Sequence, residues 1–369
     1  MNDLGYWVGF NVVRGIGPVR LKALLDHFGD IERAWRAPYD ELRRAGLNQR
    51  VIETLIETRS SLDLDRELAR IESAGVQVLT WNSPTYPALL REIPAPPPVL
   101  YVRGTLTAED AWAVAVVGTR RVSSYGREVT RRLTRALARS GITIVSGLAR
   151  GVDGEAHRTA VDAGGRTIAV LGCGVDRIYP PEHRQLAKDI VGAGALVSDY
   201  PLGTPPEAGN FPPRNRIISG LSLGVLVTEA GKRSGALITA DYAAEQGRDV
   251  FAVPGSILMR GSAGTNKLIQ EGAQVVINPE DVLEGLNLTM VAEQAEARQA
   301  LPADATEAAL LAYLTDEPCH VDELQRQAGL PIAQVTSTLA LMELKGLVRQ
   351  VGGMKYVAAH ESRAAYAAD

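Results

Sequence analysis

Arginines gather next to a chain segment that ends in small residues. Seven arginines and one acid lie between residues 120 and 139, directly after the aliphatic run 114–118. Other aliphatic runs also end in small residues, at 146–147, 172–174 and 228–231. Guanidinium groups bind phosphate oxygens in pairs, and small residues let a backbone approach an anion closely. Tight packing of helices on strands also needs glycine, but four such ends beside arginines favour a phosphate-binding edge.

Acidic and imidazole side chains offer a second kind of chemistry. Asp153 and His157 are four residues apart, which places them on one side of a helix, with Glu155 pointing away. The sequence supplies no third metal ligand nearby, so a helix cap and a structural histidine are favoured. Glu229, at the end of an aliphatic run, is a candidate general base. No P-loop, dinucleotide fingerprint or nucleophile elbow accompanies it, so we expect no catalytic residue, no metal and no cofactor.

The elements that must position these groups form an α/β pattern over residues 113–285. Short, nearly continuous aliphatic runs such as 167–171 and 223–228 alternate with amphipathic helices such as 125–140. Strands of this kind are buried on both faces, which is typical of a parallel sheet covered by helices. The carboxyl ends of parallel strands meet at one edge of a sheet, where ligands bind. We therefore expect an extended Rossmann-like sheet with the arginines at that edge.

Helical segments flank this pattern on the N-terminal side. Residues 1–80 read as helices, and Gly15-Ile16-Gly17-Pro18 before an apolar helix face resembles a helix-hairpin-helix within a SAM-like domain. Such a turn either contacts DNA or is a plain helical hairpin. Residues 81–112 contain six prolines up to Pro98 and are expected to be an extended connection.

The C-terminal part reads as a small separate domain. Residues 286–303 form an acidic linker, and residues 304–369 combine three helices with a hairpin around Gly352-Gly353. That order is the plan of a winged helix. Its expected third helix, 332–345, carries no cation before Lys345 in a strongly acidic surrounding, so contact with protein is favoured over contact with duplex DNA.

Five motifs in residues 114–277 resemble, in the same order, those of the DNA-processing protein A family. They begin at Ser146-Gly147-Leu148-Ala149-Arg150-Gly151-Val152-Asp153, Gly172-Cys173-Gly174, Phe211-Pro212-Pro213-Arg214-Asn215-Arg216, Ser234-Gly235-Ala236-Leu237 and Val253-Pro254-Gly255. The resemblance implies a non-catalytic homodimer that binds single-stranded DNA without sequence preference. It further implies loading of the recombinase RecA in natural transformation or DNA repair. His183 stands where the family pattern implies asparagine, which affects at most a local turn.

The residues expected to hold the strand come from the strand ends and the motif loops. The candidate cations are Arg120, Arg121, Arg150, Arg214, Arg216, Lys232 and Arg233, with most weight on Arg120, Arg214, Arg216 and Lys232. Further candidates are Ser146, Gly147, Asn215, Ser234 and Gly235 as hydrogen-bonding groups and Phe211 as a stacking surface. The chain has only four phenylalanines and four tryptophans, so phosphate contacts should outweigh base contacts.

Composition and sequence patterns exclude several classes of protein. The 369 residues carry a net charge of −4, and 33 arginines stand against 6 lysines. No apolar run reaches the ~18 residues of a membrane span, the N-terminus lacks a signal-peptide pattern, and two cysteines exclude a disulfide framework. A cytoplasmic location is expected. A Rossmann-type enzyme that binds or cleaves nucleotides is the alternative.

Overall fold

The computed structural model describes residues 3–288, 305–315, 317–344 and 347–358. The chain divides into two compact units, Met1–Thr289 and Met290–Asp369. Each unit has a hydrophobic core of its own.

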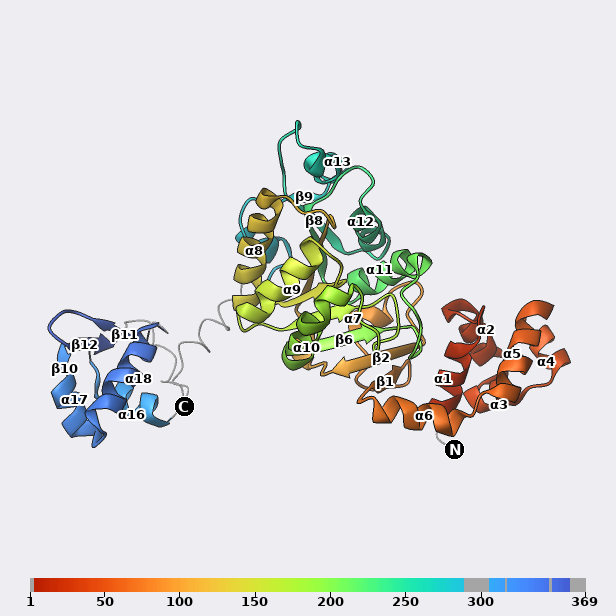
Figure 1. Ribbon diagram of the computed structural model, residues 1–369, viewed down its shortest axis with the longest axis horizontal. Coiled ribbons are helices and arrows are strands. Elements are labelled where there is room, and N and C mark those ends of the chain that lie inside the picture. The colour runs from red at the N-terminus through yellow and green to blue at the C-terminus, as the bar shows by residue number, and fades with distance from the viewer. Residues whose placement is uncertain (1–2, 289–304, 316, 345–346, 359–369) are drawn as a thin grey trace. The chain divides into compact units, whose positions relative to one another are not determined.

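A nine-stranded sheet forms the centre of the first unit (Figure 1). Its strands are β1 (Gln77–Thr80), β2 (Val99–Gly104), β3 (Ala113–Gly118), β4 (Thr143–Ser146), β5 (Thr167–Val170), β6 (Gly194–Ser198), β7 (Gly224–Glu229), β8 (Asp249–Ala252) and β9 (Gln274–Val275). The spatial order is β1-β2-β6-β5-β4-β3-β7-β8-β9. All neighbours from β6 to β9 pair in parallel, whereas β1 and β2 are antiparallel additions. The expected α/β fold with a large parallel sheet is confirmed.

Helices cover both faces of this sheet. On one face α8 (Ser124–Arg139), α9 (Val152–Asp162) and α10 (Arg184–Ala193) run side by side (Figure 1). The other face carries α7 (Ala88–Arg91), α11 (Phe211–Gly220) and α12 (Gly235–Glu245), and α13 (Ala263–Gln270) and α14 (Glu280–Gly285) follow. The side chains of β5 alternate accordingly, because Ile168 and Val170 join the α11 core while Ala169 joins the α10 core. Burial on both faces explains the continuous aliphatic runs in the sequence.

The order of the strands reverses direction between β3 and β7. The chain moves from β3 through β4 and β5 to β6 on one side, then returns to place β7 on the other side of β3. The helix that follows β3 therefore lies on one face and the helix that follows β7 lies on the other. Such a reversal opens a crevice at the carboxyl ends of the two strands, where ligands of doubly wound folds bind.

Six helices precede the sheet in the first unit. They are α1 (Leu4–Val12), α2 (Pro18–Phe28), α3 (Ile31–Arg36), α4 (Tyr39–Arg44), α5 (Gln49–Ser61) and α6 (Leu64–Ser73). Phe10 and Trp35 pack edge to face with ring centroids 5.1 Å apart. Their core also includes Tyr101 of β2 and Leu202, which follows β6. The helices and the sheet therefore share buried apolar surface.

The second unit is a winged helix, as the sequence predicts. It contains α16 (Ala305–Tyr313), β10 (Cys319–His320), α17 (Val321–Ala328), α18 (Ile332–Leu344), β11 (Val348–Gln350) and β12 (Lys355–Ala358). The strands pair in the order β10-β12-β11. Gly352 and Gly353 have φ values of 98° and 59° between β11 and β12, a conformation that glycine adopts readily. Leu310, Leu324 and Leu339 are fully buried in its core.

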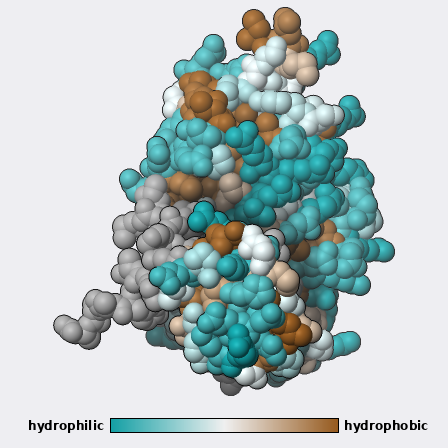
Figure 2. Space-filling view, turned by 90° about the vertical axis from the view of Figure 1, so that its left-hand side faces the viewer, coloured by the Kyte–Doolittle hydropathy of each residue, from teal (hydrophilic) through white to brown (hydrophobic). Residues whose placement is uncertain are grey.

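An apolar loop projects from the first unit between β8 and α13. Ile257 is 91% exposed and Leu258 is 87% exposed, and Met259 beside them is also exposed. The loop lies at the top of Figure 1, and hydrophobic side chains appear at the same height in Figure 2. Large apolar side chains that gather at a surface usually mark a contact with a partner. Among the described helices, none has the length and apolar composition that a membrane crossing requires.

Candidate nucleic-acid interface

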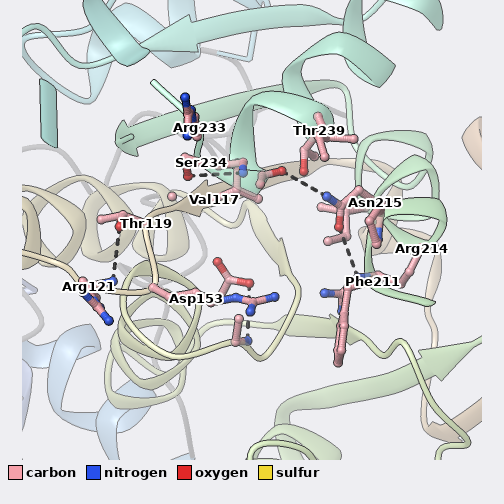
Figure 3. Close-up of a pocket in the computed structure, with 18 of the residues that line it drawn as sticks. Val117, Thr119, Arg121, Asp153, Phe211, Arg214, Asn215, Arg233, Ser234 and Thr239 are labelled. Carbon is pink, nitrogen blue, oxygen red and sulfur yellow. Dashed lines mark hydrogen bonds between the residues drawn. The ribbon is translucent and has the colours of Figure 1, made fainter. Parts of the chain in front are cut away.

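A pocket of about 450 Å³ opens at the crevice between β3 and β7 (Figure 3). Four connections line it: residues 119–121 after β3, Ala149 and Asp153 near the start of α9, residues 208–218 in and before α11, and residues 233–239 at the start of α12. We call this cavity the first pocket. The reversal of strand order thus brings together segments that are more than 100 residues apart in the sequence.

The charged residues in the lining of the first pocket are mainly cations. Arg120, Arg121 and Arg233 are exposed, Arg214 is buried, and Asp153 is the only acidic residue that faces them in the lining. The three exposed guanidinium groups have no salt bridge among the described residues. Free guanidinium groups around a cavity attract a polyanion and bind phosphate oxygens with directed hydrogen bonds.

Arg214 has a different part in this pocket, because its side chain is only 4% exposed. Its Nη1 donates to the carbonyl oxygen of Gly147 at 2.9 Å and also to that of Val170. Burial lowers the pKa of Arg214, and the nearby Asp153 carboxylate opposes that change. Arg214 therefore ties the ends of β4 and β5 to α11 and adds positive charge at the floor of the pocket.

Asp153 accepts hydrogen bonds from the loop that follows β4. The backbone N–H groups of Gly147 and Ala149 donate to its Oδ2 at 3.2 and 3.4 Å. Burial raises the pKa of Asp153, while the Arg214 guanidinium and these N–H groups oppose the rise. A Cβ on Gly147 would lie 2.7 Å from Arg214 Nη2 and 2.8 Å from Asp153 Oδ2, so only glycine fits there. Gly147 is thus needed for packing and its N–H is already used.

Phe211 supplies an aromatic surface to the pocket. It begins α11, and Pro212 and Pro213 occupy the first turn, where a missing N–H costs nothing. The guanidinium carbons of Arg120 and Arg214 lie 5.6 and 5.8 Å from the centre of its ring. Proteins that bind single-stranded nucleic acids combine aromatic rings, on which bases stack, with cations that contact the phosphates.

The start of α12 contributes hydrogen-bond donors. The Ser234 hydroxyl accepts a hydrogen bond from the N–H of Ala236 at 3.4 Å, which caps the helix. Asn215 Nδ2 donates to the carbonyl oxygen of Gly235 at 3.2 Å and so fixes α11 against α12. Gly235 itself is exposed, with open space on its side-chain position. The positive end of this 11-residue helix therefore faces the first pocket together with Arg233.

Five of the residues expected to bind phosphate do not line the first pocket, and Gly147, described above, is one of them. Ser146 is fully buried and its hydroxyl donates to Val116 at 2.6 Å. Arg216 forms an ion pair with Asp199 and donates to the Ala95 carbonyl at 2.5 Å, because it points to the opposite side of α11 from Arg214. Arg150 forms an exposed ion pair with Glu182. Lys232 lines a neighbouring cavity that shares Arg233, Ser234 and Gly235 with the first pocket.

The groups weighed for catalysis have structural partners. Both the N–H and the hydroxyl of Ser123 donate to the Glu229 carboxylate, at 3.0 and 2.9 Å, so Glu229 holds the start of α8. His157 Nδ1 lies 2.7 Å from the Thr167 hydroxyl, and burial lowers the pKa of His157 to about 3. Glu155 is buried and binds Arg127 and Arg131 at 3.2 and 2.5 Å. Among the described residues, no cluster of ligands suited to a metal ion occurs.

The sequence did not single out three lining residues, Thr119, Ile238 and Thr239. The Thr119 hydroxyl accepts a hydrogen bond from the N–H of Arg121 at 3.2 Å and so shapes the arginine loop. Thr239 follows Gly235 by one helical turn, so the helical repeat is a signal that would have placed it on the same side of α12. Ile238 carries no such signal, because an exposed isoleucine in a helix is common.

Comparison with protein families gives two matches along the chain. A family described as DNA recombination-mediator protein A matches residues 77–287, and the DprA winged helix domain matches residues 294–354. Protein Smf of Synechocystis is 39% identical over 392 residues, which cover 96% of this chain and 98% of that protein. DNA processing protein DprA of Bacillus subtilis is 44% identical over 60% of this chain and 75% of that protein.

Two of the solved structures that resemble this chain are DNA processing proteins. DNA processing protein A of Streptococcus pneumoniae has a TM-score of 0.67 and 35% identity, and the match covers 77% of this chain and 97% of that one. DNA processing protein A of Helicobacter pylori has a TM-score of 0.52 and 32% identity over 57% of this chain and 95% of that one. The latter structure is described as giving insights into a unique mode of single-stranded DNA binding.

Proposed function

Because this chain belongs to the DNA recombination-mediator protein A family, we propose that it binds single-stranded DNA in the first pocket without catalysing a reaction. The strand's phosphates lie against Arg120, Arg121 and Arg233, and a base stacks on Phe211. The observation that carries this proposal is the set of unpaired, exposed guanidinium groups around a half-buried phenylalanine ring at the crevice between β3 and β7.

The composition of the pocket supports binding without sequence preference. Guanidinium and N–H groups recognise phosphate, which is the same at every nucleotide. One phenylalanine accepts the face of any base, since all bases have a π-face. Asn215, the lining residue best suited to read a base edge, already uses its amide N–H on Gly235. A site built in this way holds strands of any sequence.

The finer function that we propose is loading of the recombinase RecA onto the bound strand, during natural transformation or DNA repair. A homodimer would place two first pockets on one strand and raise its affinity through effective concentration. The exposed apolar loop around Ile257 and Leu258 is the surface we assign to contact between two copies. The winged helix is assigned a contact with protein, because acids outnumber cations in its sequence. A cytoplasmic location follows from this function.

The test measures binding of fluorescent oligo-dT and of a mixed-sequence strand by the full chain at several salt concentrations. If four to six phosphates are neutralised, log K should fall with log salt with a slope of about −3 to −4. Reversing Arg120, Arg121 and Arg233 together to glutamate should weaken both strands by at least about a hundredfold at physiological salt. Arg43→Glu/Arg44→Glu, at the exposed end of α4, is the control for charge reversal outside the pocket, with two reversals against three. Wild-type affinity in the triple variant would refute the site.

RecA loading needs its own assay. Assembly of RecA on a strand covered by single-strand-binding protein should be faster with this chain than without it. The triple arginine variant should lose the acceleration, because a mediator must hold the strand it delivers. Equal rates with and without the wild-type chain would refute the loading function while leaving strand binding intact.

A further inference from the structure

A second cavity, of about 620 Å³, lies beside the loop that joins β5 to α10. We call it the second pocket. Its apolar surface comes from residues such as Ile178, Val191 and Leu196. Tyr179 lines it as well and is 40% exposed, so its ring is accessible from the cavity. The cavity has the size and the apolar floor of a small-ligand site.

Cations surround this apolar floor. Arg103 on β2, Arg177 in the loop, and Arg184 and Lys188 on α10 all line the second pocket and are exposed. Among the described residues none of the four has a salt bridge. The one acid in the lining, Asp176, accepts hydrogen bonds from the Gly203 N–H at 2.9 and 3.0 Å. An apolar cavity with a cationic rim fits a ligand that combines a flat apolar ring with a phosphate.

The two pockets adjoin through their aromatic residues. The ring centroids of Tyr179 in the second pocket and Phe211 in the first pocket lie 5.7 Å apart, with a tilt of 39° between the rings. A strand whose base stacks on Phe211 therefore leaves the first pocket next to Tyr179. An aromatic residue of each pocket therefore meets at their boundary, and each pocket has its own exposed cations in its lining.

We propose that the second pocket binds a further nucleotide of the same single strand. The base lies against Tyr179 and the apolar floor, and the phosphates lie against Arg177, Arg184 and Lys188. This inference rests on the proposed function, because it requires a strand that is bound in the first pocket and continues toward Tyr179. It adds a second stacking site and extends the contact from one crevice to two.

Two variants of the full chain test this. Tyr179→Leu keeps the apolar bulk and removes the aromatic face, and Arg184→Glu/Lys188→Glu reverses the rim. The probes are labelled oligo-dT of about 15 nucleotides, which can reach both pockets, and of about four nucleotides, which can fill only one. Tyr179→Leu should raise the Kd of the long strand about tenfold, because loss of one stacked base costs about 1–3 kcal/mol. The double reversal should make the salt slope about 1.4 less steep.

Controls separate this inference from the proposed function. Both variants should bind the short strand within about twofold of wild type, and Arg43→Glu/Arg44→Glu should bind both strands as wild type does. If the second-pocket variants keep wild-type affinity for the long strand while the Arg120, Arg121 and Arg233 triple variant loses it, the inference is wrong and the proposed function stands. Equal losses on short and long strands would also refute a separate subsite. If the triple variant binds normally, the proposed function itself fails. Unchanged melting temperatures show that each variant is folded.

Discussion

The guanidinium of Arg216 lies 2.7 Å from the carboxylate of Asp199, and both side chains are more than four-fifths buried. Two residues earlier on α11, Arg214 points into the first pocket. A step of two residues turns a helix by about 200°, so Arg214 and Arg216 point to opposite sides of α11. Arg214 belongs to the strand-binding side, and Arg216 holds α11 to the segment after β6.

Arg216→Met should therefore reduce stability rather than strand affinity. Removing one partner leaves Asp199 buried without its cation, which costs about 3–5 kcal/mol. Urea unfolding of the full chain measures the loss, and fluorescence anisotropy on oligo-dT should show affinity within about twofold of wild type. Arg216→Met/Asp199→Leu removes both charges and should recover much of the stability. A stable Arg216→Met variant that binds the strand weakly would show that Arg216 contacts the strand and not only Asp199.

Gly147→Ala should also destabilise the chain. The added methyl would meet the side chains of Arg214 and Asp153 at less than 3 Å, and both are fixed by hydrogen bonds to the backbone. Overpacking of this kind costs about 1–3 kcal/mol. Gly164→Ala, where no atom lies within 4 Å but φ is positive at 73°, measures the cost of backbone strain without crowding. Gly209→Ala, which has open space and no positive φ, is the neutral control. Equal stability for the Gly147 and Gly209 variants would show that the loop adjusts freely.

Acid should destabilise the first unit through His157. Burial lowers the pKa of His157 to about 3 in the folded chain, while the unfolded chain binds a proton near its ordinary pKa of about 6.5. Below about pH 6.5 the unfolded state therefore binds more protons, and stability falls by about 1.4 kcal/mol per pH unit until the folded group also titrates. Urea unfolding between pH 7 and pH 4.5 measures this slope. His157→Asn keeps a polar partner for Thr167 and should reduce the slope by about one proton, whereas an unchanged slope would exclude His157 as its cause.

Strand binding should stay with the first unit. A fragment of residues 1–289 keeps both halves of the core that Phe10 and Tyr101 share, and should fold and bind oligo-dT within about twofold of the whole chain. A fragment of residues 290–369 should show no binding at physiological salt, because its sequence is acidic around the expected third helix. Anisotropy on both fragments decides the matter. Strong binding by the second fragment alone would overturn the proposed site.

The apolar loop before α13 should control association of the chain. Ile257→Asp/Leu258→Asp places two charges on side chains that are nearly fully exposed, so the fold should survive. We expect sedimentation to show a dimer for wild type and a monomer for the variant at micromolar concentration. Val19→Asp, at a 74% exposed valine on α2, is the control. Dimers of unchanged stability in the double variant would show that another surface forms the contact between the two copies.

Much of the fold was predictable because its strands are short and aliphatic throughout. The run 167–171 contains β5, and the aliphatic run 223–228 contains most of β7. The strands β1 and β2 were not predicted. β2 begins directly after Pro98 in a segment that looks like a connection, and its partners β1 and β6 are distant in sequence. Pairing between distant segments depends on tertiary packing, which local patterns do not contain.

The site was predictable as a set of segments but not residue by residue. The strand ends and the motifs together placed Arg120, Phe211 and Ser234 at one edge of the sheet, because the carboxyl ends of parallel strands lie at the same edge. Which arginines stay free depends on the acids that tertiary structure brings near them. Arg216 forms an ion pair with Asp199, and Arg150 forms one with Glu182. The spacing of these residues along the chain predicts neither pair.

The first pocket takes its groups from connections that follow separate strands or begin separate helices, and each is anchored in the same buried sheet. Neighbouring strands are held about 4.8 Å apart by backbone hydrogen bonds that do not depend on side-chain identity. A substitution of Arg121 or Arg233, whose side chains form no salt bridge among the described residues, therefore leaves the other connections in place. These exposed cations can be exchanged one at a time while the sheet keeps its geometry, whereas a change at Gly147, Arg214 or Asn215 affects more than one connection at once.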